Sequence, residues 1–268
     1  MIFRHVGRWL AYLLIFFFTS TILAVVAFKY IPVYYTPLMV LRCMEQIADG
    51  RTPKIDHQWV PLSQMSHNLP QAVVASEDNR FLEHHGFDTE EIARAYLESR
   101  RGGRERGAST ISQQTAKNVF LWPGHSWVRK GFEAYFTVLI ENIWGKERIM
   151  EVYLNSIEMG DGIYGVKAAC RHSFDKDCGD VTKHEAALIA ASLPAPLERD
   201  SKHPSGRMLN RAGKVVDLMG KIETMPWGRP PPGAKKSGCR KNRQHSGQKR
   251  SPHGFSSGVF SFFDQMRL

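Results

Sequence analysis

The sequence has 268 residues, of which 43% are hydrophobic, a size that suits one domain of catalytic dimensions with appendages. Its net charge of +10 is typical of proteins that bind nucleic acid or anionic membranes. However, residues 226–268 hold nine Lys/Arg and one acid, so that the rest of the chain carries only +2. Nucleic acid is therefore excluded as a partner of the folded part.

The first predicted element is a membrane-spanning helix over residues 9–28. These 20 residues carry no charge, and at about 1.5 Å per residue they cross a hydrocarbon core of about 30 Å. A cleavable signal peptide is the alternative, but its apolar part would be only about 7 to 15 residues long. Arg4 and Arg8 precede the segment and only Lys29 follows it closely. This bias predicts residues 1–8 in the cytoplasm and a single-pass protein of the bacterial inner membrane with its bulk in the periplasm.

Residues 29–59 are predicted to connect this anchor to a domain over residues 60–225, with one short helix near residues 39–48. The domain is expected to be mainly α, because no pair of alternating strands is visible. Start signals such as Pro70 in a first turn, Asp88 with Glu91, and Thr110 with Gln113 predict its first helices. Further helices are expected over residues 127–144, 146–155, 182–193 and 204–220.

Residues 226–268 are predicted to form a disordered, basic tail, because Pro, Gly, Ser and Lys/Arg cannot bury enough apolar surface to fold. The chain has four cysteines, Cys43, Cys170, Cys178 and Cys239, without the spacing of a zinc site. Outside the cytoplasm Cys170 and Cys178 either close a short disulfide loop or stay unpaired.

Two carboxylates are candidates for catalysis. Glu77 ends the apolar run AVVAS, where burial would raise its pKa and suit it to accept a proton near neutral pH. Alone, an acidic pair at a helix end is more often merely solvated. Glu133 lies one turn after Arg129 on the longest helix of the domain, and its ordinary interpretation is an exposed ion pair worth a few tenths of a kcal/mol.

Basic residues and a helix start accompany these carboxylates in the sequence. Lys117, Arg129 and Lys130 carry positive charge, and the helix start at Ser109 and Thr110 offers free N–H groups. Together they indicate a site for an anion such as a pyrophosphate. Spacing alone leaves open that these residues form a solvated helix face.

Four motifs in order resemble those of the monofunctional peptidoglycan transglycosylases in glycosyltransferase family 51. Residues 77–86 (EDNRFLEHHG) resemble EDxxFxxHxG, and residues 107–118 (GASTISQQTAKN) resemble GxSTIxQQxxKN. Residues 129–133 (RKGFE) resemble RKxxE, and residues 146–155 (KERIMEVYLN) resemble KxRIxExYLN. The likeness extends over residues 60–220 and stops before residues 226–268, which are either an added tail or the result of a change of coding frame.

The resemblance implies a lysozyme-like helical domain that polymerises lipid II into β-1,4 glycan strands, with inversion and release of the lipid pyrophosphate. Glu77 is then the base that deprotonates the acceptor 4-hydroxyl, and Glu133 helps to stabilise the pyrophosphate directly or through a divalent cation such as Mg²⁺. No covalent cofactor is implied. The partners implied are lipid II with the growing strand, the membrane, and cell-wall synthesis or division proteins. The expected substrate-binding residues are Asp78, Phe81, His84, Ser109, Thr110, Gln113, Gln114, Lys117, Asn118, Arg129, Lys130 and Arg211.

Three other functions compete with this interpretation. A glycan-cleaving enzyme of the lysozyme-like class would also use a Glu beside its substrate, but it has no pyrophosphate for a basic cluster to hold. A bifunctional penicillin-binding protein would need a KTG motif and hundreds of further residues, so Ser173 and Lys176 match SxxK by chance. A non-catalytic membrane scaffold is disfavoured because Glu77 and Glu133 are both present.

Overall fold

The computed structural model describes residues 2–100, 102, 109–124 and 126–230. In this part of the chain the fold is mainly helical, as the sequence predicts. The helices are α1 (Ile2–Tyr30), α2 (Pro37–Ala48), α3 (Asn68–Glu77), α4 (Thr89–Arg100), α5 (Ile111–Phe120), α6 (Trp127–Ile143), α7 (Lys146–Ser156), α8 (Gly165–Phe174), α9 (Lys183–Ser192) and α10 (Gly206–Met219). A 3-10 turn, η1 (Leu62–Gln64), and three short strands, β1 (Asp56–His57), β2 (Glu158–Gly160) and β3 (Ile163–Tyr164), complete the fold.

Helix α1 contains the predicted anchor and is long and apolar enough to cross a membrane over His5–Tyr30. Its last turns form hydrogen bonds with side chains of α6 and α7 and of Trp144 between them. The indole Nε1 of Trp144 donates to the carbonyl of Val25 at 2.7 Å, and the guanidinium of Arg148 donates to the carbonyl of Phe28 at 2.9 Å. The Thr21 and Tyr135 hydroxyls lie 2.8 Å apart. The anchor is therefore joined to α6 and α7 by side-chain contacts.

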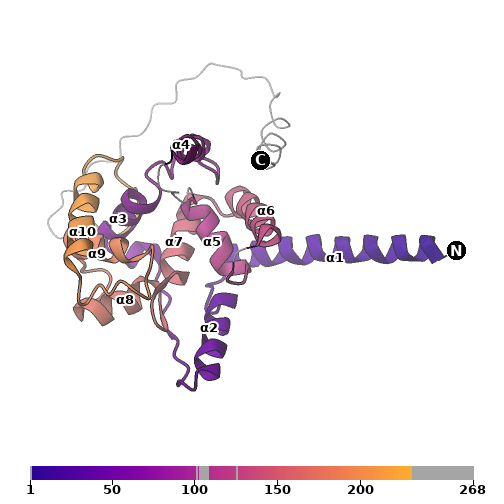
Figure 1. Ribbon diagram of the computed structural model, residues 1–268, viewed down its shortest axis with the longest axis horizontal. Coiled ribbons are helices and arrows are strands. Elements are labelled where there is room, and N and C mark those ends of the chain that lie inside the picture. The colour runs from indigo at the N-terminus through magenta and orange to yellow at the C-terminus, as the bar shows by residue number, and fades with distance from the viewer. Residues whose placement is uncertain (1, 101, 103–108, 125, 231–268) are drawn as a thin grey trace, which may run out of the picture. The chain divides into compact units, whose positions relative to one another are not determined.

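Helices α3 and α9 form the centre of the core and pack against each other and α10 (Figure 1). Both are short and buried on nearly every side, over residues 69–75 in α3 and 186–192 in α9. Because each helix is buried on nearly all sides, its sequence is a continuous apolar run and lacks the 3.6-residue alternation of apolar and polar residues that a surface helix shows. Because α3 runs through the core and ends at Glu77, that carboxylate emerges from the middle of the domain.

Helix α5 lies between α6 and α7 (Figure 1). Its start is fixed by a capping box in which the Thr110 hydroxyl and the Gln113 side chain each bond the other's backbone N–H, as the sequence predicts. Its end is fixed against α6, where the rings of Phe120 and Phe136 stack 4.5 Å apart. The side chains of α5 are thus held from both ends.

The sequence did not indicate the small sheet or α8. The sheet has the order β1-β3-β2, with β1 parallel and β2 antiparallel to β3. Its strands have two or three residues, too few to show alternation. Helix α8 begins directly after β3 at Gly165, which has a φ of +74° and lies against the backbone of Asn155. Because this helix begins at a glycine with positive φ and has no side-chain cap, its sequence lacks the usual signal for a helix start.

The cysteines within the described residues are free thiols. Cys170 and Cys178 are both buried, and burial raises the pKa of the Cys178 thiol to about 12. This corresponds to the second of the two alternatives left open by the sequence. Cys239 lies outside the described residues.

The first residues of the predicted tail are packed on the domain. The backbone of Arg229 bonds the backbone of Met65 and His67, and the Trp227 carbonyl lies 3.0 Å from Nδ1 of His67. The Trp227 ring meets the Phe81 ring edge to face at 6.3 Å. The prediction of disorder was therefore wrong for residues 226–230, because one aromatic ring gives this polar segment apolar surface to bury. Residues 231–268 lie outside the described residues.

We expect Trp227→Ala to lower the stability of the protein by about 2 to 3 kcal/mol, because it removes a half-buried ring from the contact with Phe81. The thermal midpoint of the full chain in detergent should fall by roughly 5 to 8 °C. Trp127→Ala is the matched control, since that ring is 76% exposed. Equal midpoints for the two variants would show that residues 226–230 do not belong to the domain.

Candidate active site

Glu77 is surrounded by polar groups at the end of α3. The Ser76 hydroxyl donates to its Oε1 at 3.1 Å, and the Gln114 amide donates to its Oε2 at 3.3 Å. Arg211 reaches over from α10, with its guanidinium 3.7 Å from Oε1. The side chain is 13% exposed. The apolar run before Glu77 therefore belongs to the core behind it, while the carboxylate itself meets donors.

Asp78 and His84 bond to each other rather than facing solvent. The Asp78 side chain is 2% exposed and accepts from Nε2 of His84 at 2.9 Å and from the backbone N–H of Ile111 at 3.0 Å. The N–H of Gly86 donates to Nδ1 of His84 at 3.1 Å. A neutral His84 must therefore carry its proton on Nε2. The network joins the end of α3 to the start of α5.

Three more predicted substrate residues are engaged within the fold. The side chains of Thr110 and Gln113 are occupied by the capping box, and the Thr110 hydroxyl also donates to the Gly86 carbonyl at 2.6 Å. Phe81 is fully buried. The Lys146 ammonium lies 4.5 Å from the centre of the Phe81 ring, a cation–π contact. These positions hold the loop between α3 and α4 in place.

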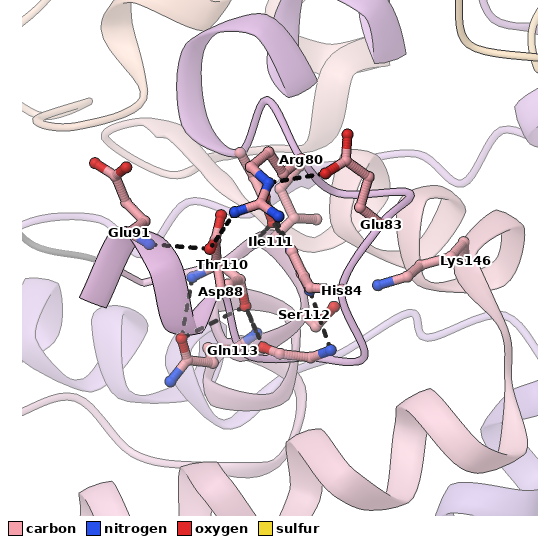
Figure 2. A network of polar contacts seen from close by, with 12 residues as sticks. Arg80, Glu83, His84, Asp88, Glu91, Thr110, Ile111, Ser112, Gln113 and Lys146 are labelled. Atoms are coloured by element: carbon pink, nitrogen blue, oxygen red, sulfur yellow. Dashed lines mark hydrogen bonds and ion pairs between the residues drawn. The ribbon is translucent and has the colours of Figure 1, made fainter. Parts of the chain in front are cut away.

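A partly buried ion pair lies against this loop. The Lys146 ammonium donates to the Glu141 carboxylate at 2.7 Å, and the Ser112 hydroxyl donates to the same oxygen. Ser112 and Lys146 belong to the polar network drawn in Figure 2, which also includes His84. Glu141 and Lys146 were not among the predicted site residues. Lys146 is the first residue of the fourth sequence motif, and this position could have indicated that it belongs to the site.

Helix α6 supplies a second carboxylate with two cations. Glu133 is 4% exposed, and its Oε2 accepts from Arg129 at 3.1 Å while its Oε1 accepts from Lys130 at 2.5 Å. Arg129 is itself buried, and its Nε has no partner among the described residues. A buried donor without an acceptor is rare in folded proteins. The Nε–H of Arg129 is thus a donor for an acceptor that is not among the described residues.

Lys117 on α5 adds a third cation to this cluster. Burial lowers the pKa of its ammonium, the nearby charges of Arg129 and Lys130 lower it further, and the charge of Glu133 opposes both effects. The three cations therefore outnumber the carboxylate by two. We call Lys117, Arg129, Lys130 and Glu133 the cation cluster. Its balance of charge suits a ligand with at least two negative charges.

Helix α5 connects the two carboxylates. Gln114 bonds Glu77, and Lys117, one turn later, lies within the electrostatic reach of Glu133. The structure thus groups Gln114 and Arg211 with Glu77, and the other basic candidates with Glu133. Ser109 is exposed and Asn118 is buried. Within the described residues, neither forms a hydrogen bond to Glu77 or Glu133.

The residues around Glu133 do not form a divalent-cation site. Both carboxylate oxygens already accept from cations, and Mg²⁺ prefers several oxygen ligands. Among the described residues no group of three or more His, Cys, Asp or Glu side chains could hold a metal ion.

A family model described as transglycosylase matches residues 44–220. The chain belongs to the transglycosylase family. It is 54% identical over 223 residues to a biosynthetic peptidoglycan transglycosylase of Bacteroides thetaiotaomicron, covering 83% of this chain and 90% of that protein. Proteins of the same description from Caulobacter vibrioides and Bdellovibrio bacteriovorus are 47% and 44% identical, over 82% and 78% of this chain and 95% and 84% of theirs.

Membership in this family establishes that the protein is a glycosyltransferase and confirms the resemblance inferred from the four motifs. The mainly helical domain of the structure agrees with the lysozyme-like fold that the resemblance implied. The matched region includes Glu77, Glu133 and all three cations of the cluster. Every residue that the sequence assigned to the active site of the transglycosylase lies in the described part of the chain.

Proposed function

We propose that this transglycosylase polymerises lipid II into β-1,4 glycan strands for the bacterial cell wall. The supporting observation is the pairing, across α5, of a carboxylate whose hydrogen-bond donors are neutral with a cation cluster. Glu77 has no cation in direct hydrogen-bond contact within the described residues, whereas Glu133 has two. The first arrangement suits a proton acceptor and the second suits an anion.

The proposed reaction uses Glu77 as a general base. Its carboxylate takes the proton from the 4-hydroxyl of an acceptor N-acetylglucosamine, and that oxygen attacks the anomeric carbon of the donor. The new C1–O4 bond forms as the C1–O bond to phosphate breaks, and the lipid pyrophosphate leaves with the electron pair. Attack opposite the leaving group converts an α linkage into a β linkage. The leaving group is already anionic, so no acid is needed to protonate it.

The cation cluster is proposed to hold the departing pyrophosphate. The free Nε of Arg129 and the ammoniums of Lys117 and Lys130 are its donors, and they act where negative charge develops. Glu133 keeps Arg129 and Lys130 in position by its two short contacts. Arg129 and Lys130 lie in the first turns of α6, so the positive end of this helix dipole lies beside their side chains.

The remaining predicted residues are proposed to act in two ways. Gln114 and Arg211 orient Glu77 or the acceptor sugar, since both reach the carboxylate. Asp78, His84, Thr110, Gln113 and Phe81 are proposed to position the catalytic elements from within the fold rather than to touch substrate. Ser109 and Asn118 remain proposed substrate contacts.

The membrane location completes the proposal. A lipid-linked donor stays in the bilayer, and α1 would keep the enzyme beside it. We propose a single-pass protein of the inner membrane with residues 1–8 in the cytoplasm and the catalytic domain in the periplasm. Cell-wall synthesis or division proteins are the protein partners that such a site would meet.

The test is incubation of the purified full chain in detergent with labelled lipid II. Polymer that lysozyme digests, formed with stoichiometric release of lipid pyrophosphate, is the expected result. The same enzyme should release no fragments from finished glycan strands. Cleavage of finished strands without polymer formation would identify the glycan-cleaving alternative instead.

Lys117 gives the proposal a pH dependence. Because burial lowers the pKa of Lys117, its ammonium loses charge at a lower pH than a solvated lysine does. The KM for lipid II should therefore rise as the pH increases through this lowered pKa. Lys117→Arg keeps its charge throughout this range, so its KM should stay flat. Parallel KM–pH profiles for the two enzymes would contradict a role for Lys117 in holding the anion.

A further inference from the structure

We propose that Tyr153 is a positioning residue, which fixes the side-chain amide of Gln114 so that its N–H group faces the Glu77 carboxylate. The inference rests on the proposed role of Glu77 as the base. Tyr153 lies on α7, Gln114 on α5 and Glu77 at the end of α3. The three side chains form one chain of hydrogen bonds across three helices.

The geometry of this chain is direct. The Tyr153 hydroxyl donates to Oε1 of Gln114 at 3.1 Å, and Nε2 of Gln114 donates to Oε2 of Glu77 at 3.3 Å. Tyr153 is fully buried. Its ring is therefore fixed by the core, and the hydroxyl is presented to α5 from a constant position.

The direction of the donors follows from the chemistry of an amide. If the Gln114 amide turned over, its Oε1 would face the Glu77 carboxylate, and two acceptors would meet without a proton between them. Its NH₂ group would then face the Tyr153 hydroxyl, which would lose its acceptor. The hydroxyl at Tyr153 therefore favours the orientation that stabilises an ionised Glu77. An ionised carboxylate is the form that accepts a proton.

Tyr153 remains a donor over the working pH range. Burial raises the pKa of its phenol well above the ordinary value, and the charges of Glu77 and Asp78 raise it further. The charged and titratable groups that interact with Glu77 include Arg211 on α10 and Tyr153, and Asp78 is its neighbour in the chain.

The chain contains a matched control. Tyr164 is also fully buried, but its hydroxyl has no hydrogen-bond partner among the described residues. Tyr153→Phe and Tyr164→Phe therefore remove the same atom from equally buried rings. Only the first removes the bond to Gln114.

The experiment measures kcat, KM and pH profiles for lipid II polymerisation by the full chain in detergent. Tyr153→Phe should lower kcat about five- to tenfold, the effect of losing one hydrogen bond, with KM within about twofold. In the kcat–pH profile the loss should be largest on the acid side, because Glu77 loses support for its ionised form. Tyr164→Phe should keep both values.

A double-mutant cycle with Gln114→Met separates positioning from general stability. If Tyr153 acts through Gln114, adding Tyr153→Phe to Gln114→Met should change kcat by less than about twofold. Losses that multiply, or a kcat that falls only in proportion to the folded fraction, would overturn the proposal.

Glu77→Gln is assayed alongside these variants. If it retains polymerisation, the proposed base is wrong. If it is inactive while Tyr153→Phe is normal, only the role of Tyr153 fails.

Discussion

Glu77→Gln is expected to lower lipid II polymerisation by about 10³-fold or more, while the protein stays folded. The amide keeps the shape of the side chain and can still contact Ser76 and Gln114, but it cannot accept a proton from the attacking hydroxyl. General base catalysis is typically worth about 10² to 10⁴ in rate. The measurement is the initial rate of polymer formation in detergent, with the thermal midpoint as the test of folding.

Glu83→Gln is the matched control for this variant. Glu83 lies on the loop after α3, is 62% exposed and pairs with Arg80 at the surface. Losing one carboxylate there should leave the polymerisation rate within about twofold, because an exposed ion pair contributes little. Similar losses for Glu77→Gln and Glu83→Gln would mean that net charge, rather than a proton acceptor, controls the rate.

Gly165→Ala is expected to destabilise the protein by about 3 to 5 kcal/mol. Gly165 has a φ of +74°, which side chains rarely tolerate, and an added Cβ would lie 2.5 Å from the backbone oxygen of Asn155. The Asn155 side chain bonds both the N–H and the carbonyl of Val60, so this backbone cannot easily move. The thermal midpoint should fall by roughly 10 °C or more, or the variant should not accumulate.

Gly213→Ala makes the same chemical change where there is room for it. Gly213 lies inside α10, and an added Cβ would meet nothing within 4 Å. Alanine favours the helix over glycine by about 0.5 to 1 kcal/mol, so the midpoint should rise by about 2 °C. A fall for both variants would show that the conformation of Gly165 is not the cause.

The helices with capping residues could be predicted from the sequence. Thr110 with Gln113, and Thr182 with Glu185, form the capping boxes that their spacing indicates. Each signal is local, because the bonds join residues three apart. Helix α8 and the sheet depend instead on Gly165 and on contacts between distant segments, which no local pattern encodes.

The candidate site was predictable as a set of residues but not as a division of tasks. The motifs named Asp78, His84 and Gln113 together with Glu77, and all four are polar. Only the structure distinguishes the side chains bonded within the fold from the carboxylate that is partly exposed. Burial and the partner of each polar atom are properties of the packed chain. A list of residues in order cannot contain them.

The bonds from Trp144 and Arg148 to the end of α1 have a consequence for how the enzyme meets its substrate. A domain on a free linker would sample many heights and tilts above the bilayer and would seldom present its active site to a lipid headgroup. Here the bonds to α1 fix the orientation of the domain relative to the axis of the anchor. With the lipid-linked donor that we propose, both reactants would diffuse in two dimensions, and each encounter in the plane of the membrane would begin with the enzyme already oriented.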